Sequence, residues 1–180
     1  HIPLANSVRA EDPMSREALY LTAKASLAKL GMPSGVDLLS IHGVNNSAML
    51  AATLPDENIH PNGGSCIEQV MRLKDEGFAR AIGFAAHCYT DDIIRIIETG
   101  KLDYVNLHFG FFSSYTNVDN QKAVLAAAKQ RMGIYCISPA AQGGDLYRPS
   151  KELIKLCAPL HPLEFALLYL FTHAGIGDAG

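Results

Sequence analysis

The chain has 180 residues, of which 48% are hydrophobic and 18% charged, and its formal net charge is -3 at pH 7. This composition is typical of a soluble globular protein with enough apolar residues for a sizeable core. The charge balance offers no basic surface for nucleic acid, and no apolar run reaches the ~18 residues of a membrane span. We therefore expect a soluble protein of the cytoplasm or of an organelle interior, such as a mitochondrion or chloroplast.

The cysteines do not form a metal-binding pattern. Their spacing is too wide for a zinc knuckle or an iron–sulfur run, so we interpret them as reduced thiols; they are Cys66, Cys88, Cys136 and Cys157. The sequence begins at His1 in the middle of a strand-like pattern, and no targeting segment is visible. A fragment or a processed chain is the expectation.

Helical segments alternate with short apolar runs along the chain. The helices carry recognisable start and stop residues, such as a Ser65–Glu68 capping box, Thr90 as a cap and Gly77 and Gly100 as terminators. The predicted helices cover residues 11–31, 65–77, 90–100, 119–133 and 161–173. The predicted strands cover residues 2–8, 36–43, 79–87, 102–110, 133–140 and 174–180. Because the apolar runs are continuous, they favour parallel strands covered on both faces.

This alternation predicts a parallel α/β fold, either a doubly wound sheet or a barrel. The first strand lacks the Gly-rich phosphate loop of a dinucleotide-binding doubly wound sheet, and polar residues gather where several strands end. We therefore predict an incomplete (β/α)8 TIM barrel, with strands 3–8 in a single domain over residues 1–180, because a full barrel needs ~250 residues. The long connections, 43–64 and 140–161, are expected to serve substrate or cofactor.

Histidines end three of the predicted strands. His42, His87 and His108 could each be a core histidine with a backbone partner, a metal ligand or a proton donor. Together with Asp178 they resemble the site of a metal-dependent hydrolase. The barrel's missing start would have to supply further ligands, and Asp178 lies in a glycine-rich turn, so we predict no metal here.

A second candidate site is the segment ISPAAQGG, residues 137–144. Ser138 follows a strand, and Gly143 and Gly144 allow close approach of a ligand to the backbone. A hydroxyl group and exposed amides at a strand end can bind a phosphate.

Several motifs together resemble one enzyme family. The order of SLAKLG, VDLLSIHG, EGFARAIGF, DYVNLHF and GIYCISPAAQGG is similar to that of the aldo-keto reductases. LLSIHGVN, GGDLYRPS and LCAPLHPLEF are closest to the branch with a C-terminal ferredoxin-like iron–sulfur tail. The resemblance covers nearly the whole chain and implies a TIM barrel that uses NADP(H) to interconvert carbonyl and alcohol groups.

The resemblance also implies roles for individual residues. His42 matches the family's catalytic histidine, which orients the substrate carbonyl and can help to relay the proton. Ser138, Gln142 and Gly143 fall in the region that binds the cofactor pyrophosphate. The family's catalytic tyrosine and aspartate would precede His1.

Other positions depart from the family. Ser7 stands where the family has its catalytic lysine, and a serine cannot lower the pKa of a tyrosine by charge. Ala85 and Ala86 replace a Ser-Asn pair, and Leu107 stands where we place the family's glutamine. The iron–sulfur ligands would lie beyond Gly180, so the residues present do not support a cluster.

Two functions remain open. The first is an NADP(H)-dependent reductase acting on a small carbonyl or alcohol substrate. The alternative is a catalytically inactive reductase fold, a pseudoenzyme, which serves as a structural subunit of a larger complex and has neighbouring protein subunits as partners. Whether the protein is an enzyme is left undecided by the sequence.

Overall fold

The fold is built on a parallel sheet. The computed structural model describes residues 2–3, 15–61, 64–111 and 120–173. All neighbouring strands are parallel, and their spatial order follows the chain. The strands are β1 (Ile2–Pro3), β2 (Val36–Val44), β3 (Ala79–Ala86), β4 (Tyr104–His108) and β5 (Gly133–Ile137). The predicted parallel α/β fold is therefore confirmed for the part of the chain described.

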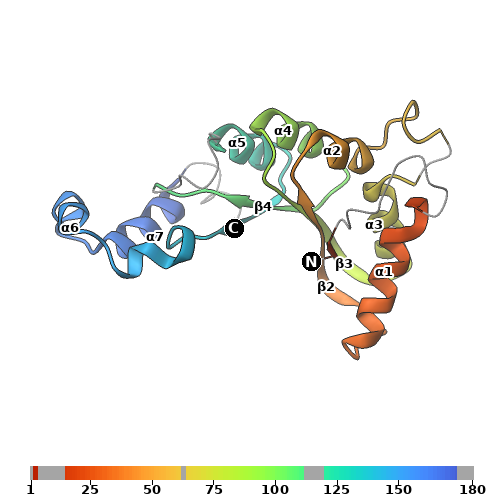
Figure 1. The fold of residues 1–180 in the computed structure, drawn as a ribbon, viewed down its shortest axis with the longest axis horizontal. Coiled ribbons are helices and arrows are strands. Elements are labelled where there is room, and N and C mark those ends of the chain that lie inside the picture. Colours follow the sequence, from red (N-terminus) through yellow and green to blue (C-terminus); the bar gives the residue numbers. More distant parts are fainter. Residues whose placement is uncertain (1, 4–14, 62–63, 112–119, 174–180) are drawn as a thin grey trace.

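Helices connect the successive strands (Figure 1). The α-helices are α1 (Ser15–Lys29), α2 (Ser47–Thr53), α3 (Cys66–Asp75), α4 (Thr90–Glu98), α5 (Gln121–Lys129), α6 (Lys151–Cys157) and α7 (Pro162–Thr172), and η1 (Gln142–Tyr147) is a 3-10 helix. Helix α1 packs against α3, and α4 packs against α5. Figure 1 shows α6 and α7 at the opposite end of the molecule from α1.

The main core lies between the sheet and its helices. Side chains alternate across a strand, so Ile41, Phe84 and Leu107 lie on the same face of the sheet. These three are fully buried in one apolar cluster with residues of the covering helices, including Val70, Leu73, Ile93, Ile96, Ile97 and Val124. Burial of each such side chain contributes roughly 1.5–3 kcal/mol to folding.

The other face of the sheet is only partly covered. Leu38 and Tyr135 are about half exposed there, at 46% and 48%, whereas the continuous apolar runs predicted coverage on both faces. Tyr104 lies over Gly83, where an added Cβ would be 2.6 Å from two ring carbons. The Tyr104 hydroxyl is hydrogen-bonded to Ser40. A small residue on one strand thus makes room for a large one on the next.

An ion pair connects α3 to the sheet. Lys74 donates from Nζ to both carboxylate oxygens of Asp103 at 2.7 Å. Asp103 Oδ2 also accepts from the backbone N–H of Ile82 at 2.8 Å, and its carbonyl accepts from Gly133 N–H at 2.9 Å. Asp103 therefore joins α3, β3 and β5 at the amino-terminal edge of the sheet.

The helix ends mostly follow the predicted signals. The capping box is present at α3, where Ser65 accepts from Glu68 N–H and the Glu68 carboxylate accepts from Ser65 N–H. Gly77 and Gly100 have positive φ angles at the ends of α3 and α4. The prediction of Thr90 as a cap is wrong by one residue: Tyr89 is the N-cap of α4, and its side chain makes no cap hydrogen bond.

The two long predicted connections contain further helices. Helix α2 lies within 43–64, and η1 and α6 lie within 140–161. A second, smaller core lies where η1 meets α7. Ala140, Leu146 and Ala166 are buried in it, and Phe111 packs against them. Among the described residues no single helix has the length and apolar character for a membrane span; α6 and α7, bent by 45°, meet that test only as a pair.

Candidate functional site

A row of histidines lies at the carboxyl-terminal edge of the sheet. His42 belongs to β2, His87 directly follows β3, and His108 ends β4. The rings of His87 and His108 are 5.0 Å apart between centroids, with their planes inclined by 46°. His42 is exposed, His87 is partly exposed and His108 is buried. The structure thus brings together the three histidines that the sequence singled out.

A bulge in β2 sets the position of His42. Ile41 pairs with Phe84 but Val44 pairs with Ala86, so β2 has one residue more than β3 across this interval. Gly43 has a φ of +81°, a conformation that L side chains rarely adopt. The glycine after the histidine therefore permits the bulge, and bulges of this kind redirect side chains beside functional sites.

Burial favours the neutral form of the two less exposed histidines, His87 and His108. It lowers the pKa of His87, and a charge on His42 lowers that pKa further. Burial likewise lowers the pKa of His108, with His87 as the second cause. At neutral pH these two imidazoles are uncharged, and each ring then has one N–H donor and one acceptor nitrogen.

Asn106 is a candidate site residue that the sequence analysis missed. Its side chain lies on the face opposite the core, between Tyr104 and His108 along β4, and it is 6% exposed. Its Nδ2 atom is buried and has no hydrogen-bond partner in the structure. An unpaired buried amide is costly, so this donor is suited to an acceptor oxygen of a ligand.

Leu107 and its neighbour Asn106 lie on opposite faces of the sheet. Leu107 is fully buried on the helix side of the sheet, where no ligand reaches it. The alternation of faces along DYVNLHF places Asn106 beside Ala85 on the open side, and this signal was available in the sequence. Ala86 lies on the core side like Leu107.

The loop after β5 contains several unusual backbone conformations. Ser138 has a φ of +56° and Ala141 one of +63°, and Gly143 and Gly144 are also positive. Ala141 N–H donates to the Ser138 carbonyl and Gly144 N–H to the Ala141 carbonyl, while Gln142 is the first residue of η1. Successive amides in such conformations form concavities that bind anions. Since Ile137 pairs with His108, the loop starts beside the histidine row.

Two predicted residues lie outside the described part of the chain, namely Ser7 and Asp178. Among the residues described, no group of three or more His, Cys, Asp or Glu side chains is arranged to hold a metal ion. The four cysteines are free. Burial raises the pKa of Cys66 to about 12 and the pKa values of Cys88 and Cys136 to about 11, so these three are unreactive thiols at neutral pH.

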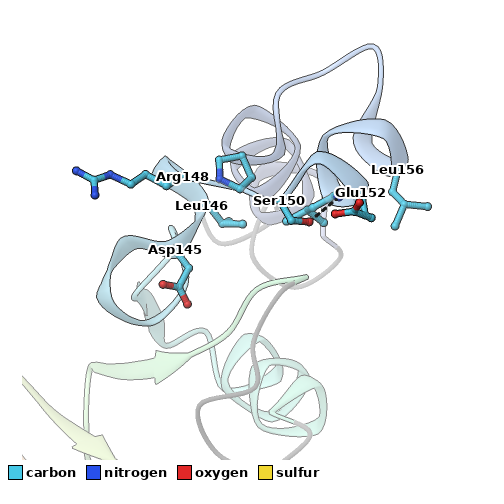
Figure 2. Close-up of a pocket in the computed structure, with 8 residues that line it drawn as sticks. Asp145, Leu146, Arg148, Ser150, Glu152 and Leu156 are labelled. Atoms are coloured by element: carbon cyan, nitrogen blue, oxygen red, sulfur yellow. Dashed lines mark hydrogen bonds between the residues drawn. The ribbon is translucent and has the colours of Figure 1, made fainter.

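A pocket of about 380 Å³ lies between η1 and α6 (Figure 2). It is lined by Asp145, Leu146, Arg148, Pro149, Ser150, Glu152, Leu153 and Leu156. None of the predicted cofactor residues lines it, and the Arg148 side chain extends away from it (Figure 2). Asp145 and Leu146 place it next to the loop that follows β5.

Comparison of the chain with models of known protein families and with curated proteins finds no match. Function is therefore inferred from the residues themselves. At one edge of the sheet lie an exposed imidazole, two neutral imidazoles, an unpaired amide donor and a loop suited to an anion. Such a set can bind a polar ligand, orient a carbonyl group and move a proton.

Proposed function

We propose that this protein is an aldo-keto reductase-like oxidoreductase that uses NADP(H) and acts on a carbonyl or alcohol substrate. The observation that carries the proposal is the convergence of His42, Asn106 and the loop from Ser138 to Gly144 at one edge of a parallel sheet. Free cysteines suit a reducing compartment, the cytoplasm or an organelle interior.

The sheet topology supports a barrel as the complete fold. A doubly wound sheet reverses its strand order at the ligand crevice, whereas the order here follows the chain from β1 to β5 without reversal. The active site of a barrel enzyme usually lies at the carboxyl ends of its strands, which is where the polar groups of this sheet gather. The proposed barrel contains these strands as part of its cylinder.

The residues present fit a nicotinamide cofactor. The unpaired Asn106 Nδ2 is a donor for the carboxamide oxygen of the nicotinamide. Ser138 and the backbone around Gly143 are suited to the pyrophosphate, because residues 138–144 include four positive φ angles and loops with such conformations can form anion-binding concavities. The bound cofactor would supply the hydride for carbonyl reduction.

His42 would orient the substrate. A ring N–H of His42 can donate to the carbonyl oxygen in either protonation state of the imidazole. This donor would hold the oxygen where negative charge develops during reduction and so stabilise the transition state. Its neighbours in the row are less accessible to water, since His87 is partly exposed and His108 is buried.

A different observation favours the second function. Several large apolar side chains of α6 and α7 are exposed, with Leu156 at 82% and Phe171 at 72%. Helix α7 is apolar on nearly all sides, which is typical of a helix buried by further protein. An inactive reductase fold that packs against neighbouring subunits would use this end of the molecule.

Titration of the purified full-length protein with NADPH, followed by nicotinamide fluorescence, tests the proposal. We expect saturable binding in the micromolar range and, for Asn106→Leu, a roughly fivefold weaker affinity, since one hydrogen bond to a neutral partner is worth about 1 kcal/mol. Lys101→Gln is the matched control, because this exposed residue lies before β4 at the opposite edge of the sheet. Absence of binding at millimolar NADPH would reject the reductase and favour the structural subunit.

A further inference from the structure

We propose that the pocket between η1 and α6 binds a small organic cation, namely a protonated amine with a short apolar body. The apolar body lies against Leu146, Leu153 and Leu156, and the ammonium group lies at Glu152. The proposal goes beyond the reductase function and does not depend on it, because none of the residues assigned to the cofactor or to the histidine row lines this pocket.

The size of the pocket suits a small molecule. Its volume is about 380 Å³, which is near the lower end of the range of about 300–1,000 Å³ for ligand pockets. Figure 2 shows Leu146 on η1 and Glu152 and Leu156 on α6, so two separate elements form its sides. A single ring with a short side chain is the kind of ligand that such a volume takes.

Apolar side chains form much of the pocket wall. Leu146 is 1% exposed and belongs to the second, smaller core. Leu156 is 82% exposed, which makes it the most exposed large apolar side chain of the described residues. Pro149 and Leu153 also line the pocket. A ligand that fills the pocket covers part of this surface, and removal of apolar surface from water favours binding.

The carboxylates at the pocket have no cationic partner. Asp145 lines it from η1 and Glu152 from α6, and neither forms an ion pair with the described residues. The Arg148 side chain extends away from the pocket (Figure 2), and Lys151 and Lys155 of α6 do not line it. A positively charged ligand therefore complements this pocket, whereas an anion is repelled by it.

NMR titration of the full chain with three ligands of one shape tests the proposal. Phenylpropylamine, phenylpropanol and phenylpropionate share an apolar body and are positive, neutral and negative. With the amine we expect saturable shifts of the methyl signals of Leu146, Leu153 and Leu156, with a Kd of the order of millimolar, as is usual for a ligand of about ten non-hydrogen atoms. The alcohol should bind about two- to fivefold more weakly, as expected for loss of one exposed ion pair, and the carboxylate more weakly still.

Two variants separate the charge from the apolar contact. Glu152→Gln should weaken binding of the amine about two- to fivefold and leave binding of the alcohol unchanged. Leu156→Ala should weaken binding of all three ligands, and the high exposure of this side chain means that the fold is kept. Glu98→Gln, which removes the same charge from an exposed position on α4, is the matched control and should change nothing.

Absence of saturable shifts at these leucines would overturn the proposal. An alcohol that binds as tightly as the amine would also overturn it, as would an unchanged affinity of Glu152→Gln for the amine. Tightest binding of the carboxylate would assign the pocket to anions through Arg148 and equally reject the cation. NADPH binding is measured separately, so a failure of the reductase function does not affect the outcome of this titration.

Discussion

At the scale of single residues, the two members of one ion pair can contribute very differently to the stability of the fold. Lys74 and Asp103 form a short ion pair, and each side chain is 38% exposed. Exposed pairs contribute little, with a median of about 0–1 kcal/mol. Asp103 has a second role that Lys74 lacks, because its carboxylate also accepts from the N–H of the buried Ile82.

Replacement of Asp103 should therefore cost much more than replacement of its partner. We expect Asp103→Ala to lower the free energy of unfolding by about 2 kcal/mol, since a buried N–H loses its acceptor, and Lys74→Ala to lower it by less than about 1 kcal/mol. Urea denaturation of both variants measures the difference. Equal losses would show that the ion pair, and not the backbone hydrogen bond, carries the stability.

At the scale of elements, capping decides where α3 begins. Ser65 is fully buried, accepts from Glu68 N–H, and its hydroxyl also donates to the Glu68 carboxylate at 2.8 Å. Ser150 caps α6 through Leu153 N–H alone and is exposed. The two serines therefore provide a matched comparison of buried and exposed caps.

Ser65→Ala should lower the free energy of unfolding by about 2 kcal/mol, at the upper end of the range for N-caps, because a buried donor and acceptor are both lost. Ser150→Ala should cost about 0.5 kcal/mol, at the lower end. Thermal unfolding of each variant, compared with the parent chain, measures both values. A larger loss for Ser150 would contradict the role assigned to burial.

Much of the element order was predictable because the start and stop residues are local signals. Helices α3, α4, α5 and α7 and strands β3 to β5 lie within their predicted ranges, and β2 extends one residue beyond its range, to Val44. The short α2 and α6 were missed, since helices of seven residues show little periodicity. The histidine row was predictable because each of its histidines lies at the end of a predicted strand. The burial of each ring and the unpaired Asn106 amide depend on packing between strands, which a local sequence pattern does not contain.

At the scale of the whole molecule, the histidine row links stability to pH. The pKa values of His87 and His108 are below their ordinary value of 6.5 in the folded protein, chiefly because of burial. The unfolded chain therefore binds more protons than the folded one as the pH falls through 6.5. The stabilisation is complete well above pH 6.5 and is lost progressively from there toward the lower pKa values of the folded state.

We therefore expect the free energy of unfolding to fall between pH 7.5 and 5.5, a range above the titration of most carboxylates. Urea denaturation at several pH values measures the slope. A variant with Gln at both positions 87 and 108 should have a flatter profile over the same range. A slope that is unchanged in this variant would place the pH dependence elsewhere in the chain.

The pairing of Gly83 with Tyr104 has a consequence for how this sequence can vary. Because the ring occupies the space above the glycine, an alanine at position 83 would collide with it. The added Cβ would also lie 2.5 Å from the backbone carbonyl oxygen of Tyr104, a clash that no substitution at position 104 removes. The two sites therefore tolerate change unequally: a library randomised at both should return glycine at position 83 and a wider range of residues at position 104.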